Sequence, residues 1–263
     1  MKPSEIQAIL TEYSVRPGKQ KGQNFLIDER VANREVDYAG IEPDDVVLEI
    51  GPGLGMLTDR LITRAKRVVG IEFDPGLCSY LRERYGDRID LIEGDALKIE
   101  FPDFDKMVSN IPYNISSPLI FKLLDHHFDR AIVMIQREFA ERMIAKPDTD
   151  DYSRLTVNTY YRAECRVLEH VPRSRFWPEP EVDSAIVMLT PRPPPFRVMD
   201  EDLFFKLIDV LFQHRRKKIS TILKMKRIAP GKVMTLPYVD LRVEALSPEQ
   251  IGVLSDSISS LKE

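Results

Sequence analysis

The stretch that decides the fold is VVLEIGPGLG, Val46–Gly55, in which an apolar run leads directly into a glycine-rich turn. The run is short and rich in β-branched residues, which favours a strand buried on both faces of a sheet. The glycines that follow let the backbone turn tightly and pass close to a ligand. The pattern predicts a parallel sheet that binds a nucleotide-like ligand at the carboxyl ends of its strands.

Similar apolar runs recur along the chain. Four more predicted strands are Val68–Glu72, Ile89–Glu93, Met107–Asn110 and Ala131–Gln136. Helical periodicity separates them at Met56–Ala65, Gly76–Tyr85 and Ser116–His126. This alternation predicts an α/β fold, a Rossmann-like sheet with helices on both faces. Two later runs, Cys165–His170 and Ala185–Leu189, would close the sheet as an antiparallel pair.

The segment Thr190–Pro195, TPRPPP, predicts a domain boundary, because successive prolines favour neither strand nor helix. We expect a catalytic domain over residues 1–190 and a small helical domain over residues 196–263. The helices expected beyond the boundary are Asp202–Leu211, Arg215–Leu223 and a last one capped by Ser247.

Charge is unevenly distributed along the chain. The formal net charge is −4, yet no acidic residue occurs from Val210 to Val239. Such a stretch can build a local positive field for a phosphate backbone, with a solvated helix face as the alternative. The residues that we expect to contact RNA are Arg215, Arg216, Lys217 and Lys218.

Several other classes of protein are disfavoured. No apolar run is long enough to cross a bilayer and the N-terminus lacks a signal-peptide pattern, so we expect a soluble, cytoplasmic protein. Cys78 and Cys165 lie far apart, and the four histidines have no triad or ligand spacing. We therefore expect neither a disulfide nor a metal site.

Acidic residues follow two of the other predicted strands. Glu72 ends the second strand, about 20 residues beyond the glycine loop, where a carboxylate can accept from ribose hydroxyls. Asp95 follows the third strand and can accept from an adenine amino group. A dinucleotide fingerprint would need glycine at position 56, which is methionine. The set indicates an adenosine-containing cofactor without pyrophosphate.

Asn110, Ile111, Pro112 and Tyr113 follow the fourth strand and suit methyl transfer to an aromatic amine. Such a nitrogen is a poor nucleophile, because its lone pair is delocalised into the ring. Acceptors on its hydrogens, the Asn110 side-chain oxygen and the Ile111 carbonyl, would direct the lone pair toward the methyl group. Pro112 would fix the backbone and Tyr113 would stack on the base. A mere proline-capped turn leaves Asn110 and Tyr113 unexplained.

A base inside a helix cannot reach such a pocket, so the target must be unpaired or flipped out. A second aromatic wall is expected from the segment RFWPEPEVDS, residues 175–184. Phe176 is the first choice and Trp177 the reserve. Either ring could instead pack under the loop.

These motifs resemble the small-subunit ribosomal RNA adenine-N6,N6-dimethyltransferases, the KsgA type and its archaeal and eukaryotic relatives, along nearly the whole chain. The motifs are GQNFL (residues 22–26), the glycine loop, NIPYNISSP (110–118), FWP (176–178) with VDS (182–184), and LFQHRRK (211–217). Ile111, where bacterial members usually carry leucine, is more similar to the archaeal or eukaryotic branch.

The resemblance implies a class I methyltransferase that uses S-adenosylmethionine. Gln23, Asn24 and Leu26 would close over the cofactor. The other cofactor residues would be Gly51, Gly53, Glu72, Asp95 and Asn110, the last belonging to the catalytic set as well.

The family adds two methyl groups to each of two adjacent adenines in a hairpin loop near the 3′ end of small-subunit RNA, late in subunit assembly. The implied partner is therefore the immature small subunit, and we expect a monomer that binds no membrane. The short C-terminal domain with its long basic stretch departs from the family pattern.

Two rival functions stay open. The first is the same chemistry on another target, DNA adenine or a glutamine amide, for which the catalytic motif is Asn-Pro-Pro-Tyr. Ile111 in place of proline and the QNFL segment argue against these targets. A non-catalytic assembly or transcription factor could retain the fold, but Asn24, Glu72, Asp95 and Asn110 are all intact.

Overall fold

The computed structural model describes residues 1–15 and 23–261. Gly22, the first residue of the GQNFL motif, lies outside the described residues. The chain divides into two compact units, one of Met1–Ala140 with Glu164–Pro191 and one of Glu141–Ala163 with Arg192–Glu263.

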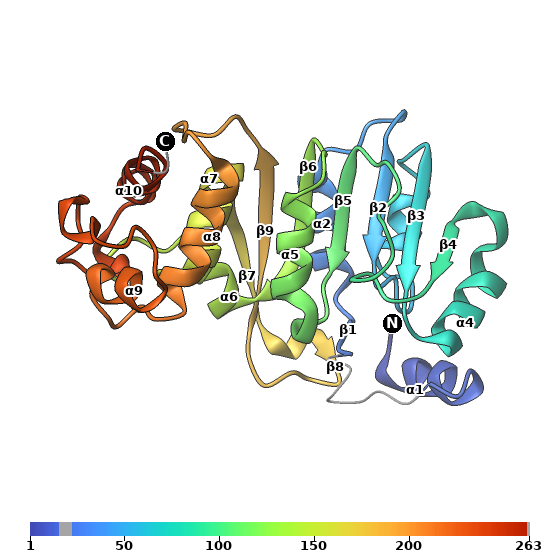
Figure 1. Ribbon diagram of the computed structural model, residues 1–263. Helices are drawn as coiled ribbons and strands as arrows, with labels where there is room; N and C mark the ends of the chain where they lie inside the picture. The colour runs from blue at the N-terminus through green and yellow to red at the C-terminus, as the bar shows by residue number, and fades with distance from the viewer. Residues whose placement is uncertain (16–22, 262–263) are drawn as a thin grey trace. The chain divides into compact units, whose positions relative to one another are not determined.

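The first unit is built on a seven-stranded sheet in the order β4-β3-β2-β5-β6-β9-β7 (Figure 1). Neighbours from β4 to β6 are parallel, and β9 is antiparallel to β6. The predicted sheet is therefore confirmed. The strands are β2 (Val46–Ile50), β3 (Arg67–Glu72), β4 (Asp90–Glu93), β5 (Lys106–Asn110), β6 (Arg130–Gln136), β7 (Ala163–Val171) and β9 (Ser184–Pro191).

The strand order fixes where a ligand can bind. The chain moves outward from β2 to β4 and then returns to β5 on the other side of β2. The connections therefore diverge between β2 and β5, the point at which open α/β sheets bind ligands at their carboxyl ends.

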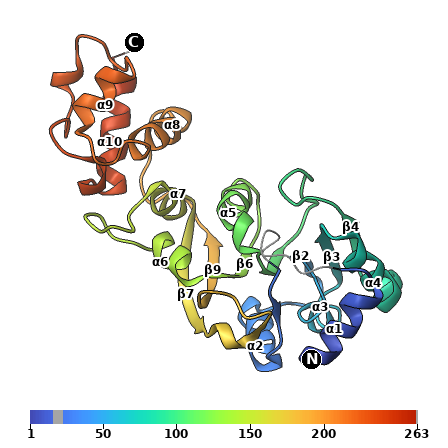
Figure 2. The ribbon, with the colours of Figure 1, turned by 90° about the horizontal axis from the view of Figure 1, so that it is seen from below.

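Helices cover both faces of this sheet. Figure 2 shows α2 (Glu29–Ala39) and α5 (Ser116–Leu124) on opposite sides of the strands. α4 (Pro75–Tyr85) contacts β3 and β4, and α1 (Pro3–Glu12) contacts α4. The side chain of Asp28 caps α2 by accepting from two backbone N–H groups of the first turn, and Gly40 ends it in the left-handed conformation.

The crossover helix predicted at Met56–Ala65 is wrong in extent, because only α3 (Thr58–Leu61) is α-helical. The tight turn at Gly55 occupies the start of the segment. At its end, the carbonyl of Asp45 accepts from the N–H groups of Lys66 and Arg67, which redirects the chain into β3.

Two very short strands form a separate antiparallel pair that the sequence did not predict. β1 (Phe25–Leu26) pairs with β8 (Phe176–Trp177), with Leu26 opposite Phe176. Figure 1 shows the pair beyond the end of the sheet to which the arrowheads of β2, β3 and β5 point. Segments distant in sequence thus meet beside the carboxyl ends of the strands.

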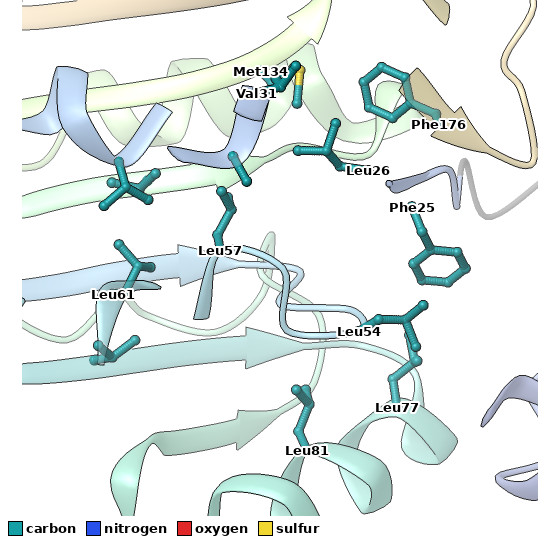
Figure 3. Packing of buried hydrophobic residues seen from close by; sticks show 14 of the residues in the cluster. Phe25, Leu26, Val31, Leu54, Leu57, Leu61, Leu77, Leu81, Met134 and Phe176 are labelled. Atoms are coloured by element: carbon teal, nitrogen blue, oxygen red, sulfur yellow. The ribbon is translucent and has the colours of Figure 1, made fainter. Parts of the chain in front are cut away.

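A hydrophobic core anchors this arrangement. Figure 3 shows Leu26, Met134 and Phe176 grouped together, with Leu54 and Leu77 close to one another beside Phe25. All six side chains are less than a tenth exposed. Burial of a leucine or phenylalanine side chain contributes about 1.5–3 kcal/mol, so the core stabilises the loops that surround the strand ends.

The second unit is helical. It contains α7 (Arg154–Arg162), α8 (Glu201–Phe212), α9 (Ile219–Met225) and α10 (Pro248–Ser259), with two 3-10 turns between α9 and α10. The predicted cap of the last helix is present, since Ser247 Oγ accepts from Gln250 N at 3.3 Å. No helix of the described residues is long and apolar enough to cross a membrane.

The boundaries of the second unit differ from the prediction. Residues 141–163 join it because Tyr152 and Tyr161 are buried in its core with Phe204, and the Tyr152 hydroxyl donates to the Leu246 carbonyl at 2.9 Å. β9 also continues through Pro191, so the proline segment begins later than expected.

The helix predicted from Arg215 begins only at Ile219. Residues 213–218 form the reversal between α8 and α9, in which Lys217 N donates to the His214 carbonyl at 2.7 Å. The reversal leaves no room for the first predicted turn of helix.

Candidate active site

A cavity of about 320 Å³ opens at the carboxyl ends of β2, β3 and β5. Its lining brings together every cofactor and catalytic residue predicted from the sequence. These residues are Gln23, Asn24, Leu26, Gly51, Gly53, Glu72, Asp95, Asn110, Ile111, Pro112, Tyr113 and Phe176.

The glycine loop shapes one wall of the cavity. Gly51 has a φ of +70° and donates its N–H to the Ile71 carbonyl at 2.8 Å, which ties the loop to β3. Gly55 has a φ of +82°, and a Cβ there would lie 2.0 Å from the Tyr85 hydroxyl. The backbone path therefore requires glycine at these two positions.

Glu72 is a buried carboxylate held by backbone donors. It accepts from Gly53 N at 3.0 Å, Phe73 N at 2.9 Å and Asp74 N at 3.0 Å. Burial raises the pKa of Glu72, and these three hydrogen bonds oppose the rise. The carboxylate thus links the glycine loop to the end of β3 and stays at the cavity wall.

Phe73 is a lining residue that the sequence analysis missed. The residue is 63% exposed, and it lines the cavity beside Glu72. Its signal in the sequence is an aromatic residue directly after the acid that ends the strand.

Glu49 also lines the cavity from the end of β2. It is 1% exposed and accepts from the Thr58 hydroxyl at 2.7 Å. Burial, opposed by this hydrogen bond and reinforced by the nearby Glu72 carboxylate, raises the pKa of Glu49 to about 8. The sequence identified Glu49 as part of the glycine motif but gave it no separate role.

Asn110 ends β5 and is held by a buried acid. Its side-chain nitrogen donates to Glu35 Oε1 at 2.7 Å and to Oε2 at 3.2 Å, in the amide orientation that satisfies both groups. Glu35 belongs to α2 and is wholly buried. This pairing leaves the amide oxygen as the group turned away from Glu35, and Asn110 lines the cavity.

The residues after Asn110 are fixed in turn. Ile111 is buried, and its N–H donates to the Met134 carbonyl at 3.0 Å. The Tyr113 hydroxyl shares a 2.7 Å hydrogen bond with Ser184 Oγ, and burial raises the pKa of Tyr113. The Tyr113 ring is therefore anchored at its far end.

Phe176 lines the cavity but is only 5% exposed. Its strand partner Leu26 places the QNFL segment at the same wall. Trp177, the reserve choice for the second aromatic wall, is not among the lining residues. The structure thus places the first choice at the cavity.

Asp95 lines the cavity from the loop after β4. Its Oδ1 accepts from Leu97 N at 3.0 Å. The Lys122 ammonium donates to the carbonyls of Ala96, at 2.8 Å, and Ile99, which fixes the loop that carries Asp95.

The predicted RNA-contacting residues belong to the second unit. Arg215 is engaged within the unit, because its guanidinium contacts Glu244 Oε2 at 3.0 Å and the Asp150 carbonyl at 2.8 Å. Arg216, Lys217 and Lys218 are exposed. Within residues 1–15 and 23–261, no group of three or more His, Cys, Asp or Glu side chains could hold a metal ion.

Residues 16–258 match the family model described as ribosomal RNA adenine dimethylase. The chain belongs to this family. It is 45% identical to the probable ribosomal RNA small subunit methyltransferase A of Methanosarcina acetivorans, over 98% of this chain and 99% of that one. It is 44% identical to the protein of the same name from Thermococcus kodakarensis, over 93% and 91%.

Solved structures agree with the class I methyltransferase fold. A dimethyladenosine transferase from Plasmodium falciparum superposes with a TM-score of 0.78 at 32% identity, covering 90% of this chain and 98% of that one. The 23S rRNA methyltransferase ErmE has a TM-score of 0.67 at 32% identity, covering 90% and 100%.

Proposed function

We propose that this protein dimethylates the N6 amino groups of two adjacent adenines in a hairpin loop near the 3′ end of small-subunit ribosomal RNA, with S-adenosylmethionine as the methyl donor. Membership of the ribosomal RNA adenine dimethylase family supports the reaction class. The names of the archaeal relatives support the small-subunit target, and the immature subunit is the proposed partner.

The cavity fits an adenosine-containing cofactor. Gln23 Oε1 is buried there without a hydrogen-bond partner among the described residues, an acceptor that a bound ligand's donor would satisfy. Glu72, Asp95 and Phe73 all line the cavity. There Glu72 would accept from ribose hydroxyls, Asp95 would accept from an amino group, and Phe73 would offer an apolar face. S-adenosylmethionine would supply the methyl group as an electrophile.

The chain's own residues would activate the target nitrogen. The Asn110 oxygen and the Ile111 carbonyl would accept from the two N6 hydrogens, which localises the lone pair on nitrogen. Tyr113 would stack on the base and Phe176 would limit the opposite side. Because these groups are already fixed, the enzyme spends little free energy on ordering them during the reaction.

One observation carries the proposal. With the Asn110 amide oriented to donate its nitrogen to the Glu35 carboxylate, the oxygen is the group available to an adenine amino group. If Asn110 presented its side-chain nitrogen instead, its N–H groups would face the N–H groups of the adenine, and no hydrogen bond could form.

We further propose that residues 196–263 contribute RNA binding through Arg215, Arg216, Lys217 and Lys218, and that the protein acts as a cytoplasmic monomer. The absence of acidic residues from Val210 to Val239 supports the RNA contact.

Unmethylated small subunits and large-subunit RNA, each incubated with the protein and S-adenosylmethionine, would test the function. Nuclease digestion and mass spectrometry should show N6,N6-dimethyladenosine only in the small-subunit RNA, mapped to two adjacent positions. Modification of large-subunit RNA alone, of DNA or of a protein glutamine would overturn the proposed target.

A further inference from the structure

Glu35 is a wholly buried acid that no motif contains. Its neighbours on the inner face of α2 are Val31, Ala32, Val36 and Ala39, all buried. A carboxyl group in such a place is costly unless it is hydrogen-bonded. Its presence therefore calls for a specific partner.

That partner is Asn110. When the Asn110 amide is turned with its nitrogen toward the acid, the orientation that satisfies both groups, that nitrogen lies 2.7 and 3.2 Å from the two Glu35 carboxylate oxygens. The other charged groups that act on Glu35 are the carboxylates of Glu49 on β2 and Glu169 on β7. The nearest cation on α2, Arg34, is paired with Glu169 at 2.5 Å. The Glu35 carboxylate therefore contacts the active site through the Asn110 amide.

We infer that Glu35 is a positioning residue that orients the Asn110 amide with its oxygen toward the target adenine. The inference rests on the proposed function. The two orientations of a carboxamide have nearly the same shape, so packing alone cannot select one. A carboxylate accepts hydrogen bonds but donates none, and it therefore selects the orientation with nitrogen toward Glu35.

Ionisation of Glu35 would control this selection. A protonated Glu35 can donate to the amide oxygen and so permit the reversed orientation. Burial and the Glu49 carboxylate hold the pKa of Glu35 well above the ordinary carboxyl range, opposed by the hydrogen bond from Asn110. The methyl-transfer rate should therefore rise with pH as Glu35 loses its proton.

Single-turnover methylation of small subunits tests the inference with three variants. Glu35→Leu removes the acceptor without leaving a buried charge, and should slow methyl transfer about 10- to 100-fold, as loss of a group that orients an active-site residue does. KM for the RNA and Kd for S-adenosylmethionine should change by no more than about twofold, because Glu35 contacts neither ligand in this arrangement. Glu35→Gln, which folds around the same volume, should fall between this variant and the wild type.

The pH profile separates positioning from a merely structural role. The wild-type rate should rise with pH, whereas the Glu35→Gln rate should lack the part of the rise due to Glu35. Glu169→Gln is the matched control: it removes a neighbouring acid that does not contact Asn110, and should keep the wild-type rate at high pH.

Each outcome bears on one proposal. An inactive wild type would contradict the proposed function itself. The role of Glu35 would be overturned if the wild type is active and both Glu35→Leu and Glu35→Gln methylate as fast as the wild type. Unchanged Asn110 side-chain amide resonances in the NMR spectrum of Glu35→Gln would also overturn it. A Glu35 variant that loses only affinity for S-adenosylmethionine, with an unchanged rate of methyl transfer, would also overturn the role of Glu35.

Discussion

The cavity of the first unit and the basic stretch of the second use charge in opposite ways. Around the cavity, Glu35, Glu49 and Glu72 are at most 5% exposed, and each is hydrogen-bonded to a named partner. In the stretch from Val210 to Val239, Arg216, Lys217 and Lys218 are exposed. The buried carboxylates hold particular atoms in place through hydrogen bonds, whereas the exposed cations create a positive electrostatic field at the surface.

This difference teaches where single substitutions should matter. A buried polar group has few partners and cannot be replaced by water, so loss of one affects a specific step. Exposed cations act together on a flexible polyanion and are screened by salt, so each contributes a small share. The predictions below test this contrast.

The largest effect is expected for Asn110→Ala. It removes the proposed acceptor for the adenine amino group, and should slow methyl transfer by about 10³-fold or more. Single-turnover mass spectrometry of the modified nucleosides measures this rate. A rate within threefold of the wild type would remove Asn110 from the chemistry.

The next effect is a pH dependence of stability due to Glu49. Its pKa of about 8 in the folded protein exceeds the ordinary 4.5, so the stability it contributes is full below pH about 4.5 and is lost as the pH rises through 8. Glu49→Gln stays neutral and should gain stability relative to the wild type as the pH rises, by about 4 kcal/mol between pH 5 and pH 8.5.

Urea unfolding of both proteins at pH 5 and pH 8.5 measures this gain. Glu12→Gln, at an exposed position of α1, is the matched control. A constant difference between wild type and Glu49→Gln would show that Glu49 is ionised in the folded state across the range.

A smaller effect is expected for Glu72→Ala. The substitution removes the proposed acceptor for the ribose and the hydrogen bond to Gly53 N, so affinity for S-adenosylmethionine should fall about 10- to 100-fold, or ~1.4–2.8 kcal/mol. Calorimetry measures it. Glu93→Gln is the control, because Glu93 ends the next strand but pairs with Arg82 at 2.9 Å and does not line the cavity. Equal losses in both variants would argue against a specific role for Glu72.

The smallest effect belongs to the basic stretch. Lys217→Gln with Lys218→Gln should weaken RNA binding several-fold and reduce the slope of log K against log salt by about 1 to 2. Lys2→Gln with Lys66→Gln, exposed lysines of the first unit, should leave the slope unchanged. A slope unaffected by the first pair would place the RNA elsewhere.

The sequence predicted the parallel strands and the cavity residues because their signals are local. Each strand is a short apolar run, and each proposed ligand group directly follows one, so topology alone brings Gly51, Glu72, Asp95 and Asn110 to one edge. Phe176 followed from the need for a second aromatic wall beside a flipped-out base, whereas Leu26, which lies far from it in sequence, followed only from the family resemblance.

The missed features depend on contacts between distant segments. Glu35 lies in ERVANREVDYA among other charged residues, where it looks like one more solvent-facing charge, and only the pairing with Asn110 explains its burial. The strand pair β1 and β8 is too short to show any alternation. Likewise, α7 joins the second unit through the packing of Tyr161 on Phe204, which no local pattern indicates.

A crystal structure with bound S-adenosylmethionine tests the central claim most directly. We predict the adenosine between Glu72 and Asp95, and the sulfonium methyl facing the Asn110 oxygen while the Asn110 nitrogen remains on Glu35. A cofactor bound outside this cavity, or an Asn110 that presents its nitrogen to the methyl group, would contradict the account.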